Sequence, residues 1–394
     1  MPLPFTPPWN ESYWLVRFLF QRGLALVYLF AFLVAANQYR ALAGEDGLLS
    51  LQQYVDNVNW KERPSLFHRF DSDRAIQAAA WTGVALSLVA LTGISEQFGT
   101  AVSVAVWFAL YALYLSFVNA GQLFYGYGWE SMLLETGFFA IFLGASGAVA
   151  PFLVILMLRW VLFRNMFGAG LIKLRGDDCW RDLTCMDYHY ETQPMPNPLS
   201  WFFHHLPDRF HRVEVMVNHV MELVVPFLYF APQPVAAIAG VATILFQGWL
   251  MLSGNFAFLN LLTIVLAVST FSDGVLSALP VAVPGTAPLH PVHQAAVVLV
   301  AGVTLVLSVD PVRNMLSSRQ RMNWSFNPLH IVNTYGAFGS ITKERYQLVI
   351  EGTREEDPSE GDWEEYTFRG QPVKVDERPP QWAPYHLRLD WQLW

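Results

Sequence analysis

Residues 14–36 read WLVRFLFQRGLALVYLFAFLVAA, a nearly continuous run of apolar side chains. A helix needs about 20 apolar residues to cross the roughly 30 Å hydrocarbon layer of a bilayer. The run is long enough for this and therefore predicts a transmembrane helix. Arg17 and Arg22 lie in its first half, where long basic side chains can extend toward the N-terminal interface.

Runs of the same kind recur down the chain as far as Val309. Of the 394 residues, 54% are hydrophobic and 14% are charged, whereas soluble domains carry about 25% charged residues. The predicted fold class is therefore an all-α polytopic helical bundle in a membrane. Two of the runs are short, so we expect eight to ten spans. The predicted spans are 14–36, 75–93, 101–120, 131–150, 151–174, 213–230, 235–253, 256–271 and 292–309.

The composition changes after Asp310, where apolar runs stop and charged residues and prolines become frequent. Within this tail, Tyr346–Gly352 and Trp363–Gly370 alternate between apolar and polar residues, as half-buried strands do. The predicted division is a multi-span membrane domain at 1–310, which includes a polar loop at 175–212, and a small β-rich domain outside the membrane at 311–394.

The polar loop contains the run GDDCWRDLTCMDYHYETQPMPNP at 176–198, which holds both cysteines of the chain, Cys179 and Cys185. Their C-x5-C spacing differs from the C-x-x-C of redox-active thiols, and a zinc site needs four ligands. Three interpretations stay open: a structural disulfide in an extracytoplasmic loop, two free thiols, or thiol exchange. The first is favoured because secreted and lumenal compartments are oxidising.

Charged residues also fall inside predicted spans. Glu135, Arg159, Arg164 and Glu222 are such residues, and His219 shares a helix face with Glu222 because they are three positions apart. Charges within a membrane are costly and either pair or line a polar cavity. One interpretation is therefore a ligand-binding or catalytic cavity in the bundle. The other, slightly favoured, is structural ion pairing, for example between Glu135 and Arg159.

Half of the ten histidines lie within 31 residues. Imidazole is a common metal ligand, but no His pair matches the metalloprotease pattern. We therefore interpret these side chains as part of loop and interface packing, and predict neither a metal site nor a cofactor. The clustered residues are His189, His204, His205, His211 and His219.

The sequence argues against several function classes. The formal net charge of −8 argues against a nucleic-acid partner, because phosphate binding needs a basic face. The lipase elbow G-x-S-x-G, a Walker A loop and a dinucleotide fingerprint are all absent from the sequence. Asn323, in Asn323-Trp-Ser325, is a candidate glycosylation site if the tail enters the secretory lumen.

Several motifs together resemble the lipase maturation factor family. They cover nearly the whole chain and are long enough to be specific. The motifs are NAGQ at 119–122, YGYGWESMLLETG at 125–137, GAGLIK at 168–173, the run 175–198, NPLHIVNTYGAFG at 327–339 and PYHLRLDW at 384–391.

The resemblance implies a multi-pass protein of the endoplasmic reticulum membrane that helps secreted homodimeric lipases to fold and assemble. Its lumenal C-terminal region is implicated in client binding. Bacterial relatives exist, for which the cell membrane is the expected location and the client differs. Family members continue well past the Leu-Asp-Trp motif, whereas this sequence stops three residues after it. We therefore expect the outward domain to be incomplete.

The family is also distantly similar to the membrane domain of the vitamin K-dependent γ-carboxylase, in which a lysine at a span end acts as base. Lys173 is the corresponding position in this sequence. A base lysine needs burial to lower its pKa. We favour a simpler structural role, in which Lys173 extends to the membrane interface beside the charged residues that follow it.

Three functions follow from these patterns. The first is a non-enzymatic, chaperone-like maturation factor that holds partly folded secreted clients at the outward side, with membrane lipids around its bundle. The second is a membrane enzyme acting on a lipid-soluble substrate or a peptide, and the third is a thiol-exchange factor using Cys179 and Cys185. An odd span number with the N-terminus inside places the polar loop and the tail outside. The candidate client-binding residues are Trp180, Tyr188, His189, Tyr190 and Trp201, and the candidate catalytic residues are Lys173, Glu135, His219 and Glu222.

Overall fold

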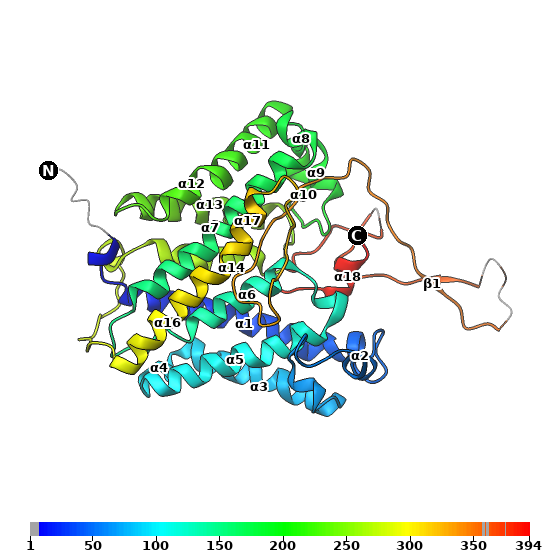
Figure 1. Cartoon of the computed structure of the whole chain (residues 1–394). Coiled ribbons are helices and arrows are strands. Elements are labelled where there is room, and N and C mark those ends of the chain that lie inside the picture. The colour runs from blue at the N-terminus through cyan, green and yellow to red at the C-terminus, as the bar shows by residue number, and fades with distance from the viewer. Residues whose placement is uncertain (1–7, 357–358, 360–361, 375) are drawn as a thin grey trace.

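The computed structural model describes residues 8–356, 359, 362–374 and 376–394, and most of them are helical. The long helices run lengthwise through the molecule in alternating directions (Figure 1). They are α1 (Trp14–Ala43), α3 (Asp73–Thr92), α5 (Thr100–Ala120), α6 (Gly128–Ala140), α7 (Phe152–Arg175), α11 (Asp208–Leu223), α13 (Val235–Ser253), α14 (Leu259–Ala267) and α16 (Pro291–Leu307).

The predicted helical membrane bundle is confirmed. Within the described part of the chain, six helical segments are long and apolar enough to cross a bilayer: α1, α3, α5, α7, α13 and the stretch Pro291–Leu316. This count is below the predicted eight to ten because three predicted spans form shorter helices. The shorter helices are α6 with 13 residues, α11 with 16 and α14 with 9.

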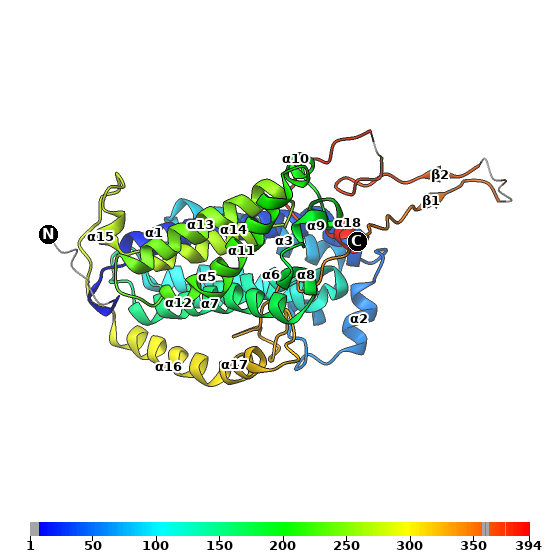
Figure 2. The ribbon, with the colours of Figure 1, turned by 90° about the horizontal axis from the view of Figure 1, so that it is seen from above.

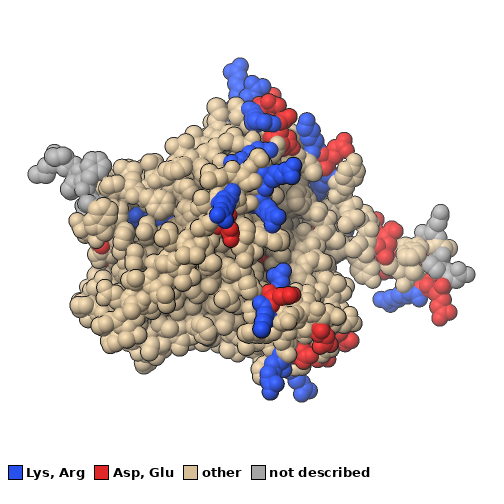
Figure 3. Space-filling view, in the orientation of Figure 1, with Lys and Arg blue, Asp and Glu red and all other residues tan. Residues whose placement is uncertain are grey.

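The connections between these helices gather at two ends of the bundle. At one end, Asp273 accepts hydrogen bonds from the N–H groups of Trp14 and Leu15, at 2.7 Å each. At the other, which we call the polar end, the α1–α3 loop, residues 176–207 and the tail meet. On the face drawn in Figure 3, charged side chains gather at the polar end and are nearly absent elsewhere. This distribution suits a bundle whose apolar part lies in lipid.

Short helices occupy the connections. At the polar end these are α2 (Leu51–Asn57), η2 (Leu66–His68), η3 (Gln122–Tyr125), α8 (Asp178–Arg181), α9 (Met186–Thr192), α10 (Ser200–His204), α17 (Val309–Leu316) and α18 (Arg388–Gln392). The others are η1 (Pro8–Asn10), α4 (Ile94–Gln97), α12 (Val225–Leu228), η4 (Val268–Thr270) and α15 (Asp273–Leu276).

The core of the bundle is aromatic where α1, α3 and α5 pack together. Tyr28 and Phe32 of α1 meet Tyr114 of α5 edge to face, with ring centroids 5.8 and 5.4 Å apart. Gly83 of α3 allows this close approach, because a Cβ there would lie 2.2 Å from Phe32. Such tightly packed aromatic side chains give the bundle a rigid side against which the other helices assemble.

The tail contains an antiparallel pair of short strands, β1 (Glu351–Gly352) and β2 (Glu364–Glu365). Both lie within the predicted strand segments but are only two residues long. Glu351 faces Glu365 across the pair, and like charges in register weaken a ladder. These strands belong to an arm, residues 342–356 and 362–370, that projects from the polar end beyond the bundle (Figures 1 and 2).

Candidate functional site

Two segments of the tail are anchored inside the bundle by buried charges. The first is a strap, residues 327–341, which lies against α6 and α7. There Glu135 and Arg164, both fully buried, form an ion pair. The same carboxylate accepts hydrogen bonds from the backbone N–H of Asn333 at 2.9 Å and the hydroxyl of Tyr335 at 2.6 Å. Glu135, a candidate catalytic residue, therefore has a structural role.

The expected pairing of Glu135 with Arg159 is wrong. Arg159 instead donates to the backbone carbonyls of Ser269 at 2.7 Å and Tyr229 at 3.0 Å. Five residues separate Arg159 from Arg164 on α7, which rotates their side chains apart by about 140°. Only Arg164 can therefore face α6.

The second anchor joins α18 at the C-terminal segment to α5 and α6. Arg388 pairs with Glu130 at 2.9 Å, and both side chains are fully buried. The guanidinium also donates to the carbonyl of Phe124 at 2.7 Å and lies over the ring of Tyr125. His386 lies 3.5 Å from Glu130, and burial lowers its pKa to about 4. Its imidazole is therefore neutral near pH 7.

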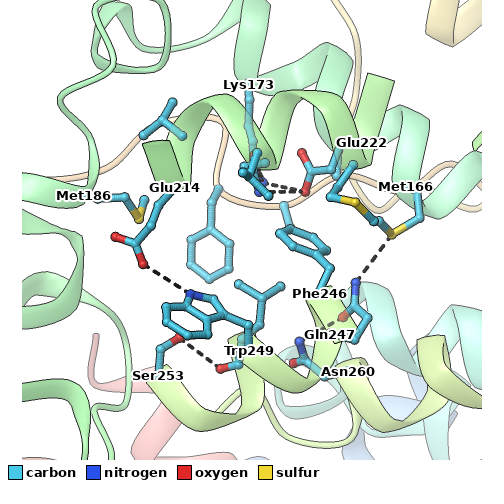
Figure 4. A pocket seen from close by; sticks show the side chains of 18 of the residues that line it. Met166, Lys173, Met186, Glu214, Glu222, Phe246, Gln247, Trp249, Ser253 and Asn260 are labelled. Carbon is cyan, nitrogen blue, oxygen red and sulfur yellow. Dashed lines mark hydrogen bonds and ion pairs between the residues drawn. The ribbon is translucent and has the colours of Figure 1, made fainter. Parts of the chain in front are cut away.

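A cavity of about 490 Å³ lies between α7, α11, α13 and α14 near the polar end (Figure 4). Its volume falls in the range of about 300–1,000 Å³ usual for ligand pockets. Phe246, Trp249 and Met166 contribute apolar walls, and the Lys173–Glu222 ion pair forms one polar side. The bundle thus contains a cavity that is mostly apolar and has one charged side, and its role as a ligand site stays a prediction.

Lys173 turns into the bundle, so its expected extension to the interface is wrong. Its ammonium donates to Glu222 at 2.6 Å and to Asn218 at 3.1 Å, and it lies 4.7 Å from the ring centroid of Trp180. These partners on α11 and α8 satisfy a buried cation that the interface would otherwise have to solvate. A lysine held as an ammonium by a carboxylate is poorly placed to act as a base.

The candidate catalytic residues are only partly brought together. His219 and Glu222 share the face of α11 that meets α7 and α8, where His219 Nε2 lies 2.9 Å from the carbonyl of Trp180. Lys173 joins them, whereas Glu135 lies in the strap anchor. Asn218 forms hydrogen bonds with both Lys173 and Glu222, and this role was not predicted from the sequence. Its position four residues before Glu222 on a helix was the available signal.

Most of the candidate client-binding residues are buried. Trp180, His189 and Tyr190 are 2%, 7% and 4% exposed, and Tyr188 is half-buried, whereas Trp201 is 63% exposed. The prediction that the first three are exposed contacts is wrong, because α8 and α9 turn inward and pack around the two cysteines. Burial lowers the pKa of His189 to about 3, with a smaller effect from the charge of Lys173.

Cys179 and Cys185 form a disulfide between α8 and the start of α9. Both residues are buried, at 4% and 0% exposure. Thiol exchange requires an accessible sulfur atom. The burial of this pair therefore favours a structural role.

Replacing both cysteines, Cys179→Ala with Cys185→Ala, should lower the free energy of unfolding by about 2 kcal/mol, because the bond closes a short loop. Client maturation at permissive temperature should persist. Thermal unfolding with and without reductant, together with secreted client activity, would check both expectations. The wild type treated with reductant should match the variant. Loss of maturation in a variant that remains folded would instead point to thiol exchange.

The clustered histidines serve different structural contacts. His211 Nδ1 lies 2.9 Å from Glu214, His205 is exposed, and His204 lies 3.5 Å from Glu191. In the described residues, no group of three His, Cys, Asp or Glu side chains is arranged to hold a metal ion.

Asn323 is exposed, as a glycosylated residue must be, and its glycosylation stays a prediction. The nearby His330 was not identified from the sequence as a structural residue, although His330 lies in one of the motifs that carry the family resemblance. It is 6% exposed, and its ring nitrogens contact Ser131 at 3.1 Å and Asn119 at 3.0 Å. Burial, and to a smaller degree the charge of Arg63, lowers its pKa to about 4.

Acid should destabilise the protein through His330. An unfolded histidine has a pKa of about 6.5, so the folded state favours the neutral ring, and stability falls as the pH drops from about 6.5 toward 4. The slope from one such group is at most about 1.4 kcal/mol per pH unit. In His330→Asn, which suits the positive φ of 53° at this position, thermal unfolding should depend less steeply on pH.

The exposed His205→Asn is the matched control and should keep the wild-type slope. Equal slopes in all three proteins would contradict the role assigned to His330. His189 and His386 should retain part of the pH dependence in each of them, because burial lowers their pKa values as well.

Known proteins resemble the chain over nearly its full length. Residues 15–278 match the family described as the lipase maturation factor transmembrane domain, and residues 331–394 match the lipase maturation factor C-terminal domain. Lipase maturation factor 1 of Homo sapiens is 43% identical over 97% of this chain and 74% of its own length, and that of Bos taurus is 42% identical over 97% and 75%. Lipase maturation factor 2 of Rattus norvegicus is 35% identical over 66% of this chain and 41% of its own length. No solved structure matches the chain.

Proposed function

Because the chain belongs to the lipase maturation factor family, we propose that it is a multi-pass membrane protein whose polar end holds secreted lipases while they fold and assemble. The names of its relatives point to lipases as the clients, and the helical bundle would anchor the protein in the membrane. The observation that carries the proposal is the arm, which extends from the polar end (Figure 2). Several of its apolar side chains are exposed.

The arm has the properties of a surface for transient protein binding. Tyr346 is 83% exposed, Leu348 57% and Tyr366 60%. Exposed apolar side chains in one segment favour contact with a partner. The short strand pairing also leaves backbone groups free to bond an extended client segment by strand addition. Glutamates 344, 351, 355, 356, 364 and 365 make the arm acidic and favour a client with a basic surface.

The polar end is proposed to face away from the cytosol, toward the endoplasmic reticulum lumen in a eukaryotic host or the exterior in a bacterial one. The Cys179–Cys185 disulfide at this end supports that orientation, because disulfides persist in oxidising compartments. The same orientation places Asn323 in the compartment where glycosylation occurs. In this scheme residues 1–310 are the membrane domain, and residues 311–394 are the outward domain.

The other two functions have less support. The buried disulfide leaves little access for thiol exchange. The Lys173–Glu222 ion pair removes the free base that a carboxylase-like reaction would need. A maturation factor that acts by binding requires neither group to react.

The arm is testable with a triple variant, Tyr346→Ser, Leu348→Ser and Tyr366→Ser. Crosslinking to a homodimeric lipase client, and secretion of active lipase from cells lacking the endogenous factor, should both fall at least about tenfold, because truncating a central contact residue costs about 1 kcal/mol or more. The measurements are recovery of crosslinked client from membranes and lipase activity in the medium.

The matched control is Trp60→Ser, Leu66→Ser and Phe70→Ser, which removes three exposed apolar side chains from the α1–α3 loop at the same end. This control should stay within about twofold of wild type. Equal losses in both variants would mean that general surface apolarity, not the arm, holds the client. Full activity of the arm variant would overturn the proposed binding surface.

A further inference from the structure

The cavity described above opens sideways, between α11 and α13. Val217 of α11 and Leu245 of α13 line it and are themselves 47% and 69% exposed. Each belongs to an apolar exposed stripe of its helix with helical spacing. The stripes are Val213, Val217 and Val220 on α11, continued by Val224 directly after it, and Ile238, Val241, Leu245 and Leu252 on α13. The opening therefore lies in a surface that suits lipid, which makes a membrane lipid the natural occupant.

The cavity extends along the length of the helices. Lys173 lies near the end of α7 at the polar end, and Asn165 lines the cavity eight residues earlier on the same helix. At 1.5 Å per residue these positions are about 12 Å apart. The cavity can therefore accept an extended chain whose head stays near Lys173 and whose tail runs toward Asn165 and Ala242.

The polar side of the cavity lacks one hydrogen-bond donor. Glu222 is 4% exposed, and Lys173 donates to its Oε1 at 2.6 Å. Its Oε2 is buried and has no hydrogen-bond donor among the described residues. A buried carboxylate oxygen without a donor has lost the hydrogen bonds that water would give it, which destabilises the unliganded site. A ligand group that donates a hydrogen bond would remove this cost.

The charges around the cavity disfavour an anionic head group. The Lys173–Glu222 ion pair is neutral overall. Glu214 also lines the cavity, where it accepts hydrogen bonds from the hydroxyl of Tyr190 at 2.7 Å and the indole of Trp249 at 3.2 Å (Figure 4). A phosphate or carboxylate entering here would meet two carboxylates and one cation. An uncharged hydroxyl avoids that repulsion, donates to Glu222 and accepts from Lys173.

We propose that this cavity is a binding site for a neutral membrane lipid with a hydroxyl head group, such as diacylglycerol. One acyl chain enters between α11 and α13 and lies against α7 and α14, and the other chain remains in the bilayer. The hydroxyl reaches the Lys173–Glu222 pair. This site is separate from the arm and does not depend on the proposed function.

The test uses the full chain in nanodiscs of phosphatidylcholine with three photoreactive probes that carry the same diazirine acyl chain: diacylglycerol, phosphatidylcholine and free fatty acid. Diacylglycerol should label preferentially, and the labelled peptides should come from α7, α11, α13 or α14. Unlabelled diacylglycerol should compete with this labelling in the wild type. That competition does not depend on any variant folding.

Ala242→Trp puts a bulky side chain at a position that lines the cavity and should reduce diacylglycerol labelling at least about tenfold. Val298→Trp is the matched control, because Val298 lies on α16, is 56% exposed and does not line the cavity. It should label within about twofold of wild type. Thermal unfolding of both variants verifies folding. Undiminished labelling of folded Ala242→Trp, equal labelling by phosphatidylcholine, or preferential labelling by the fatty acid would each overturn the proposal.

Discussion

Arg388→Met should lower the free energy of unfolding by about 3–5 kcal/mol, the usual cost of breaking a buried ion pair by removing one partner. The substitution leaves the Glu130 carboxylate fully buried without its cation. It also removes the donor to the carbonyl of Phe124. Thermal or denaturant unfolding of the purified chain, and the fraction recovered as monodisperse protein, would measure the loss.

The matched control is Lys374→Met, which removes a cation from the exposed pair with Glu377. Exposed pairs contribute about 0–1 kcal/mol, so this variant should behave as wild type. The double variant Glu130→Met with Arg388→Met should recover part of the stability lost in Arg388→Met, because no buried charge remains unpaired. If Arg388→Met unfolds at the same temperature as Lys374→Met, the anchor has no structural role.

Glu135→Met should also lower the free energy of unfolding by about 3–5 kcal/mol. It leaves Arg164 buried without its carboxylate and removes the acceptor for the backbone N–H of Asn333 and the hydroxyl of Tyr335. The strap should then separate from α6 and α7. Limited proteolysis should show faster cleavage between residues 317 and 341, together with a lower unfolding temperature.

Asp178→Asn is the control here, because Asp178 pairs with Arg181 at the surface and its side chain is 75% exposed. It should leave both measurements unchanged. An unaltered cleavage pattern in a Glu135→Met variant with a lower unfolding temperature would mean that the ion pair stabilises α6 and α7 but does not hold the strap.

The long helices could be predicted closely from the sequence. The predicted span 235–253 coincides with α13 (Val235–Ser253), and 151–174 differs from α7 (Phe152–Arg175) by one residue at each end. An apolar run of about 20 residues has few other stable conformations in a membrane. Such runs therefore fix helix bounds through local composition alone.

The shorter helices could not be bounded this way. The predicted span 131–150 ends early as α6 because the chain leaves the helix after Ala140, and Gly144 then adopts a positive φ of 79°. The predicted span 213–230 begins earlier, at Asp208, and is interrupted near Pro226. Hydropathy averages over these glycine and proline positions, although they set where a helix stops.

The contacts of the site residues could be predicted only in part from the sequence, because their partners lie far away along the chain. Lys173 was recognised as a candidate, but its partners Asn218 and Glu222 lie 45 and 49 residues away. Trp180 and Tyr190 belong to a polar, aromatic loop, which suggested exposure. They are buried because α11 packs over that loop. Tertiary packing decided their roles, and a linear pattern does not contain it.

The C-terminal anchor has a consequence for biogenesis. Arg388 is the residue that compensates Glu130, yet a ribosome adds it 258 residues later. During translation α5 and α6 enter the membrane with an acidic group that still lacks its counter-ion. The nascent bundle therefore lacks this ion pair until the segment that carries Arg388 is made. A chain interrupted before Arg388 would leave the Glu130 carboxylate among the helices without its cation, so completion of this part of the membrane core is coupled to the synthesis of a segment far downstream.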